Sequence, residues 1–150
     1  MKDIFDRGVT NELIARIEKV LPESRPLWGK MSSAQMMAHC NVPYEMVFDN
    51  RHKKPGPFKT FLLKLFVMNI VVGEKPYKKE SPTPPEFLVR DERDFENEKQ
   101  RLIAHLRKTQ QLGRNWFEGR ESHSFGALTA QQWNNMFYKH LDHHLSQFGM

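Results

Sequence analysis

Cysteine is almost absent from this chain of 150 residues, which contains only Cys40. A single cysteine excludes an internal disulfide, which suits a reducing compartment. The N-terminal stretch MKDIFDRGVT also lacks the apolar segment of a secretory signal, so we expect a cytoplasmic protein. The composition, 39% hydrophobic and 27% charged, is that of an ordinary globular chain, and the length predicts a single domain over residues 1–150.

Long apolar runs are lacking as well. The longest is FLLKLFVMNIVV at residues 61–72, which is too short to span a bilayer and is interrupted by Lys64. We interpret this run as a buried helix or a subunit contact, with attachment to a membrane surface as the alternative. A membrane is therefore not expected among the partners.

Charge of one sign is not concentrated in any single block. The net charge is +5, but the basic residues occur as RHKK at 51–54, as KPYKK at 75–79, and elsewhere interleaved with acids. No helix-turn-helix, zinc-finger or RNP-like motif accompanies them. We interpret them as a solvated surface and expect no nucleic acid as a partner; the weaker alternative is nucleic-acid binding by the basic loops.

Amphipathic helices with clear end signals are what the chain does contain. Ser32 with Gln35, and Thr129 with Gln132, have the spacing of capping boxes that open two helices. No convincing strand pattern is present. The apolar periodicity and the residues that start and stop helices predict four helices, over about Thr10 to Leu21, Ser32 to Asn50, Asp91 to Leu112, and Thr129 to the C-terminus.

Proline and glycine qualify this helical pattern. Thr10 is predicted as the first N-cap, Pro43 is expected to kink the second helix, and Gly113 is expected to stop the third. Between residues 51 and 90 we expect a short extra helix followed by a proline-rich extended connector at 73–86. The overall prediction is an all-α four-helix bundle with a short extra helix in the 51–90 insertion.

Histidines are the most informative residues of the last predicted helix. On a helical wheel, His140 and His144 lie about 40° apart in the middle of the apolar face, whereas His143 lies on its flank. The spacing H-x-x-x-H on one helix face lets two imidazoles converge on one ion. His39 faces the expected core from the second helix in the same way.

Three inward imidazoles from two helices are able to surround a divalent metal on one side and leave other positions open. The alternative is that they are core histidines bonded to neighbours. This ligand type suits zinc, nickel, iron or copper, and we favour zinc or nickel. Gln147 is a candidate to orient a ligand imidazole.

Two segments give the chain a resemblance to the DinB/YfiT-like superfamily: MMAHCNVPYEM around His39 and HLDHHLSQFG around His140 and His144. The segment HSFGALTAQQWNNMFYKHLDHHLSQFG is most similar to a bacterial DinB-like branch of unknown function. That branch has proline where this chain has Ser124. The resemblance covers roughly residues 10–50 and 90–150 and does not explain the 51–90 insertion.

The resemblance implies a DinB-like four-helix bundle, often dimeric, with a metal held by His39, His140 and His144. It also implies metal-dependent activity on low-molecular-weight thiols, as a transferase, isomerase or hydrolase. We therefore expect a metal-dependent enzyme that acts on a small-molecule substrate, and the resemblance implies a homodimer. His123 is the candidate catalytic acid or base; the alternative, which its position favours, is a turn residue that caps backbone groups. The alternative function is a non-catalytic bundle used for binding or dimerisation.

Overall fold

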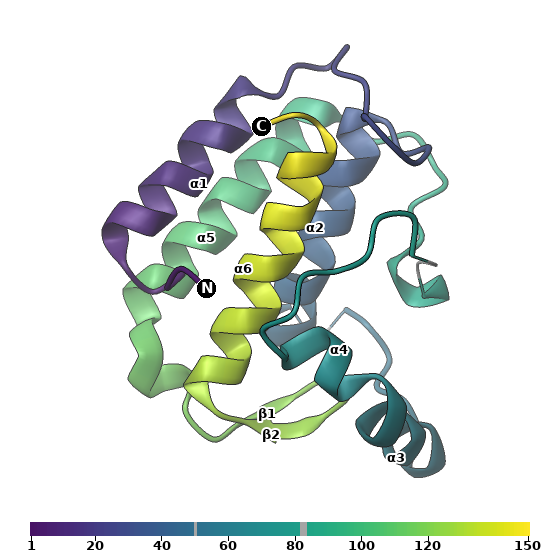
Figure 1. Cartoon of the computed structure of the whole chain (residues 1–150), viewed down its shortest axis with the longest axis vertical. Helices are drawn as coiled ribbons and strands as arrows, with labels where there is room; N and C mark the ends of the chain where they lie inside the picture. Colours follow the sequence, from purple (N-terminus) through teal and green to yellow (C-terminus); the bar gives the residue numbers. More distant parts are fainter. Residues whose placement is uncertain (50, 82–83) are drawn as a thin grey trace.

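The computed structural model describes residues 1–49, 51–81 and 84–150, without the side chain of Glu86, and it is mostly helical (Figure 1). The described elements follow one another in the order α1 (Arg7–Lys19), α2 (Ser33–Phe48), α3 (Pro57–Phe66), α4 (Met68–Val72), a 3-10 helix η1 (Pro85–Phe87), α5 (Phe95–Phe117), β1 (Arg120–Ser122), β2 (Gly126–Leu128) and α6 (Ala130–Gln147).

The long helices α1, α2, α5 and α6 lie side by side and enclose the core (Figure 1). Helix α5 contacts the other three, and α6 contacts both α2 and α1. Each helix turns an apolar face inward, which removes large side chains from water and supplies most of the driving force for folding. The largest fully buried side chains are Trp133, Tyr44, Phe117, Phe137, Ile4, Leu13, Ile17, Met36, Met37, Leu102, Leu106 and Leu128.

The two predicted capping boxes are confirmed. Ser32 Oγ accepts from Gln35 N while Gln35 Oε1 accepts from Ser32 N, and Thr129 exchanges the same pair of bonds with Gln132. These bonds satisfy backbone donors that have no partner within the helix. They fix where α2 and α6 begin, and therefore where the histidines of these helices lie along the helix axes.

The prediction for the start of α1 was wrong. Asp6, not Thr10, is the N-cap, and its carboxylate accepts from Val9 N. Thr10 is instead buried within the helix, where its hydroxyl donates to the Ile4 carbonyl at 2.8 Å. Either side chain is able to cap, but only the tertiary contact with the N-terminal segment removes Thr10 from that role.

Gly113 interrupts α5 where the helix was predicted to stop, but it does not end the helix. Gly113 has φ 70° and ψ 174°, and the helix resumes for a last turn that ends at Phe117. The start is later than expected, because Asp94 caps the helix. The prediction that the chain contains no strands was wrong, because β1 and β2 form a short antiparallel hairpin with Arg120 opposite Leu128.

The apolar run at 61–72 is not a buried helix. It is split between α3, which has no buried residue, and α4, in which Val72 is buried. Helix α4 is held to α6 because Lys139 Nζ donates to the Ile70 and Gly73 carbonyls and Asn135 donates to the Val72 carbonyl. None of the described helices is long and apolar enough to cross a membrane.

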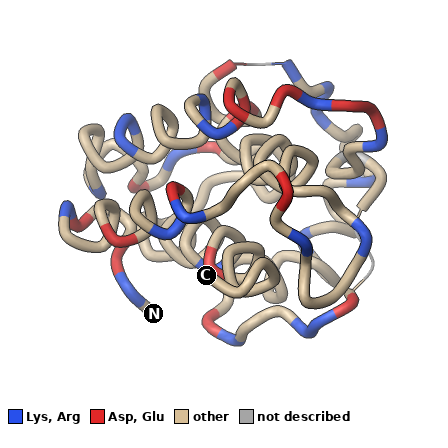
Figure 2. Tube along the Cα trace, turned by 90° about the horizontal axis from the view of Figure 1, so that it is seen from above, with Lys and Arg blue, Asp and Glu red and all other residues tan. Residues whose placement is uncertain are grey.

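Two predicted segments extend beyond the described residues. Asn50, the last residue expected for the second helix, is one of them, and residues 82–83 of the expected connector are the others. In the described part of that connector, η1 is a turn of helix rather than extended chain. Lys and Arg residues are interspersed with Asp and Glu residues along much of the chain trace (Figure 2).

Candidate metal centre

Helix α2 carries His39 into the interior. His39 is 3% exposed and lies four residues before Pro43, through which α2 continues. Proline has no N–H, so it cannot bond to the carbonyl of His39 in the usual helical pattern. The buried face of α2 places this imidazole toward α6 rather than toward solvent.

Helix α6 supplies the other two imidazoles. His140 and His144 are one turn apart and share a face, as the wheel predicted. His144 is buried and His140 half-buried. The ring centroid of His39 lies 4.8 Å from that of His140 and 4.5 Å from that of His144, and those of His140 and His144 are 4.8 Å apart. The three histidines, called the triad below, therefore converge as predicted.

The ring nitrogens of the triad are close enough to share one ion. One ligand atom from each residue lies within 4.8 Å of the others, and Nε2 of His39 is 2.8 Å from Nε2 of His140. Zinc bonds imidazole nitrogen at about 2.0–2.1 Å, so two ligands at the tetrahedral angle are about 3.3 Å apart. The distance between Nε2 of His39 and Nε2 of His140 would therefore have to increase by about half an ångström, which a small rotation of either ring provides.

Two of the three imidazoles have their tautomer set by an acceptor. His39 Nδ1 is 2.8 Å from the carbonyl of Phe87 in η1, and His144 Nδ1 is 2.8 Å from Gln147 Oε1. An oxygen of either kind only accepts here, so each Nδ1 carries the proton and each Nε2 keeps its lone pair. Metal-binding histidines usually show this arrangement, in which the ring nitrogen that does not bind the metal donates its N–H to an oxygen.

Gln147 is itself held in place by the N-terminal half of the chain. Its Nε2 donates to the Trp28 carbonyl at 2.7 Å, which fixes which side of the amide faces His144. Gly29 makes this approach possible: it has φ 81°, and a Cβ there would lie 2.6 Å from Gln147 Nε2. The expectation that Gln147 orients a ligand imidazole thus matches its contacts.

His140 differs from the other two. Its Nε2 faces Nε2 of His39, whose proton is on Nδ1, so His140 must donate in this bond. Binding a metal would require His140 to carry its proton on Nδ1 instead. The triad is therefore satisfied by its own hydrogen bond, and it becomes a three-nitrogen donor set after one tautomer change.

The triad favours uncharged imidazoles. Burial lowers the pKa of His39, lowers that of His140 well below its usual range, and lowers that of His144 to about 3. The neighbouring histidines lower the pKa of His140 and His144 further. Only a neutral imidazole donates a lone pair to a metal, so at neutral pH the triad has the charge state that metal binding needs, and only the tautomer of His140 must change.

His123 does not join the triad. It lies between β1 and β2, where Nδ1 bonds to Ser124 Oγ and Nε2 lies 3.3 Å from the His52 carbonyl. Ten residues of α6, about 15 Å along its axis, separate the start of that helix from His140. Among the described residues no hydrogen bond or ring contact connects His123 with the triad.

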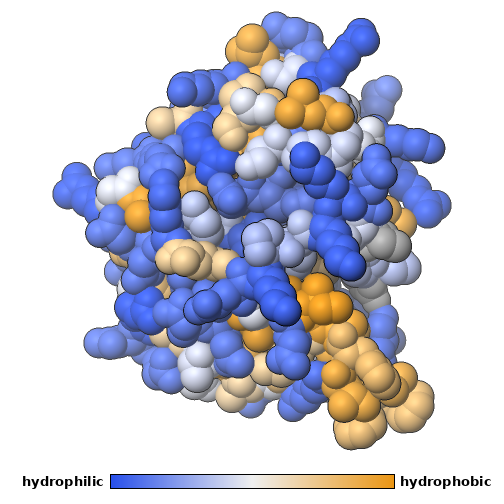
Figure 3. All heavy atoms as spheres, viewed as in Figure 1, coloured by the Kyte–Doolittle hydropathy of each residue, from blue (hydrophilic) through white to orange (hydrophobic). Residues whose placement is uncertain are grey.

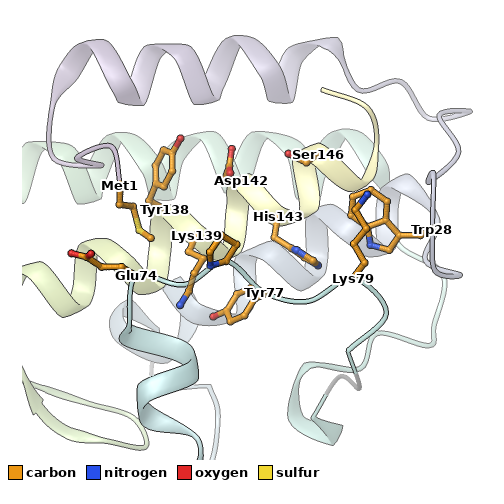
Figure 4. Close-up of a pocket in the computed structure, with 11 residues that line it drawn as sticks. Met1, Trp28, Glu74, Tyr77, Lys79, Tyr138, Lys139, Asp142, His143 and Ser146 are labelled. Atoms are coloured by element: carbon orange, nitrogen blue, oxygen red, sulfur yellow. The ribbon is translucent and has the colours of Figure 1, made fainter.

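His143 contacts His144 and also lines a cavity of about 400 Å³, whose lining contains no residue of the triad (Figure 4). The ring centroids of His143 and His144 are 5.0 Å apart, and the His143 ring makes edge contacts with the rings of Trp28 and Tyr77. Lys79 lies over the Trp28 ring, and the lining combines aromatic surface with charges of both signs. The lining residues are Met1, Trp28, Glu74, Pro76, Tyr77, Lys79, Tyr138, Lys139, Asp142, His143 and Ser146.

Sequence reasoning missed the contributions of the insertion. The Phe87 carbonyl and the Tyr77 ring come from the segment between α4 and α5, whose only sequence signal was its proline content. The Phe87 ring also lies against His39 and His140, at 5.7 and 6.1 Å between centroids. The insertion thus covers one side of the triad.

The model of one protein family, described as "Protein of unknown function (DUF1569)", matches residues 8–149. This match spans nearly the whole sequence, so the chain belongs to the DUF1569 family. Neither the curated proteins nor the solved structures contain a match to the chain.

Proposed function

For this member of the DUF1569 family, we propose that the triad holds a divalent metal ion and that the chain is a metal-dependent enzyme acting on a small substrate. The observation that carries the proposal is the convergence of three neutral imidazoles, two of which, His39 and His144, have Nδ1 held by the Phe87 carbonyl and by Gln147. We further propose that the four long helices form a bundle of the DinB/YfiT-like type, which the sequence resembles.

The donor set suits zinc or nickel, because both accept imidazole nitrogen. A divalent ion in such a site lowers the pKa of a bound water or thiol and so supplies a nucleophile at neutral pH. We accordingly assign the reaction to the transferase or hydrolase type, with thiol-containing molecules as the first substrates to test. The cavity beside His143 has room for the part of a small molecule that does not react.

The chain's own residues have defined tasks in this proposal. His39, His140 and His144 bind the ion; the Phe87 carbonyl and Gln147 keep two of the rings aligned; and the Phe87 ring restricts water on one side of the site. A catalytic role for His123 would require the hairpin to approach the triad, because its present partners are Ser124 and the loop after α2.

The second candidate is a non-catalytic bundle used for binding or dimerisation. The bond between Nε2 of His39 and Nε2 of His140 favours it, because the two rings satisfy each other without an ion. In that case the three histidines are core residues, and the family's function lies at its surface.

Elemental analysis of untagged protein purified without chelator distinguishes the two candidates. We expect about one zinc or nickel per chain, and we expect His140→Ala to lose it while the helical circular dichroism signal remains. His143→Ala is the matched control, since it removes a neighbouring histidine outside the triad and should retain the metal. Protein that takes up no metal after incubation with zinc or nickel, or a His140→Ala variant that keeps it, would refute the metal site.

Binding of a metal alone does not establish an enzyme. Metal-loaded wild-type protein and metal-free His140→Ala protein would next be compared on a panel of low-molecular-weight thiols with transferable or hydrolysable groups. Turnover by the first and not by the second supports the enzyme. Metal binding with no turnover on any panel member favours a structural ion and the non-catalytic candidate.

A further inference from the structure

Helix α3 exposes an unusually apolar surface. It has no buried residue, and large side chains of α3 and α4 are between 37% and 76% exposed. Hydrophobic residues gather at the corner of the molecule where Figure 1 places these helices (Figure 3). Water contact of this much aromatic and aliphatic surface on one element marks an interaction site. The residues concerned are Phe58, Phe61, Leu62, Leu65, Phe66 and Ile70.

The exposed side chains of α3 occupy one face of the helix. At 100° per residue, the span from Phe61 through Phe58 to Phe66 covers an arc of about 140°. Lys59 lies about 20° beyond one edge of that arc and Lys64 about 60° beyond the other. The helix therefore presents an apolar stripe bordered on both sides by a lysine.

The charged side chains of residues 51–73, which include α3, are all basic. Residues 51–73 contain Arg51, Lys53, Lys54, Lys59 and Lys64 and no Asp or Glu. From other elements, Asp49 pairs with Arg51 at 3.6 Å, and Glu121 of β1 lies near Lys64 beside Gly126. The loop that precedes α3 and the helix itself thus carry a net positive charge next to the apolar stripe.

We propose that α3 and the basic loop at 51–54 attach the chain to an anionic membrane surface, independently of the metal proposal. A helix with aromatic and leucine side chains on one face and basic residues beside it lies in the lipid interface, and here the exposed Lys53 and Lys54 supply the charge for the headgroups. Each basic residue near an anionic surface adds attraction. The helix lies on the membrane and does not span it.

The same features disfavour two other partners for α3, a second copy of the chain and a nucleic acid. A second copy docked through α3 would bring two sets of basic residues together, and residues 51–73 offer no carboxylate to pair with them. Nucleic acid would satisfy the lysines but would leave the phenylalanine and leucine side chains in contact with water. An anionic lipid surface satisfies both the charge and the apolar area.

Vesicle co-sedimentation of the full chain tests this surface. We expect binding to phosphatidylcholine vesicles with about one third phosphatidylglycerol, much weaker binding to phosphatidylcholine alone, and weaker binding as salt is raised. The double variant Phe61→Ser with Leu65→Ser should lower the partition coefficient at least roughly ten-fold. Lys53→Gln with Lys54→Gln should lower it by roughly ten-fold as well.

Two control variants show whether a loss of vesicle binding is specific to α3. Leu21→Ser changes an exposed leucine outside α3 and should bind vesicles like the wild type. His140→Ala should also bind vesicles normally, so failure of the metal site and failure of this surface are separate results. Absence of binding to anionic vesicles at low salt would refute the proposal. So would a dimer in solution that the Phe61 and Leu65 changes dissociate, since α3 would then be a contact between copies.

Discussion

Two buried polar clusters share helix α2, and they differ in how completely they are satisfied. The triad begins at His39. The second cluster, called the ion-pair network below, begins two residues later at Asn41, whose amide donates to the Glu98 carboxylate at 2.9 Å. Arg101 donates to the same carboxylate and to Glu45. The remaining members are His52, bonded to Glu45, and His105, bonded to Asn41.

The contrast separates a structural cluster from a candidate site. In the network every charge has an opposite charge and the hydrogen bonds end on protein groups, so nothing is left to bind a ligand. The triad has no carboxylate, and its nitrogens point at one another. Burial is common to both, so burial alone does not indicate function; the convergence of lone pairs does.

Removing the central carboxylate of the network should have the largest effect on stability. Glu98→Ala leaves Arg101 partly uncompensated, and we expect the free energy of unfolding to fall by about 3 kcal/mol, the low end for a broken buried pair because Glu45 remains. Urea denaturation would measure this loss. Glu96→Ala, an exposed change in the same turn of α5, should cost less than about 1 kcal/mol. Zinc affinity should be unaffected by either change.

Acid should weaken the triad before it protonates the carboxylates of the network. In the metal-free chain the triad histidines have a lowered pKa, so the unfolded state binds more protons, and stability present above pH 6.5 is lost as pH falls. Between pH 6.5 and 5.5 the loss should reach up to ~3 kcal/mol for three histidines. Urea midpoints at these two pH values would show it.

The carboxylates of the network should respond in a lower pH range than the triad, whereas burial lowers the pKa of His105 as it does those of the triad histidines. Burial alone would raise the pKa of Glu45, but hydrogen bonds from His52 and Arg101 outweigh it and lower the pKa. The corresponding stability is therefore present above the usual pKa of glutamate and is lost as pH falls below it. A His140→Leu variant should show a smaller loss between pH 6.5 and 5.5. An identical loss in that variant would mean that the triad does not titrate on unfolding.

Zinc should stabilise the wild type and not the triad variant. At a free zinc concentration one hundred times the Kd, mass action adds about 2.7 kcal/mol, which raises Tm by roughly 5–10 °C for a domain of this size. Thermal denaturation with zinc and then with excess chelator would measure the shift and its reversal. Glu98→Ala should show the same shift from a lower starting Tm, whereas His140→Ala should show none.

The smallest of these effects concerns the amide that orients His144. Gln147→Leu removes the acceptor of its Nδ1 proton, and zinc affinity should fall by about 10–100-fold. Gln147→Glu keeps an acceptor but cannot donate to the Trp28 carbonyl. Competition titration with a zinc indicator should give the Glu variant near-normal affinity. Equal losses in both variants would show that Gln147 acts through packing rather than through the His144 ring.

Local signals predicted the framework well. The capping boxes at Ser32 and Thr129 and the break at Gly113 were read correctly, because each depends on residues within one turn of the helix end. Thr10 shows the limit of this reasoning. It has the side chain of an N-cap, but a contact with Ile4 places it inside the helix. The β1–β2 hairpin, with three residues in each strand, is too short to leave a periodic pattern.

The sequence by itself determined the candidate ligands. A turn of helix separates His140 from His144, and helical periodicity alone places both imidazoles on the apolar face of α6, as it does His39 on α2. What only the tertiary structure decided was the completion of the site and the exposure of α3. The Phe87 and Trp28 carbonyls reach the site from segments distant in sequence, where no periodic pattern specifies position. Whether an apolar run is buried depends on which surfaces remain uncovered after the long helices have packed. No such surface covers α3, which has no buried residue.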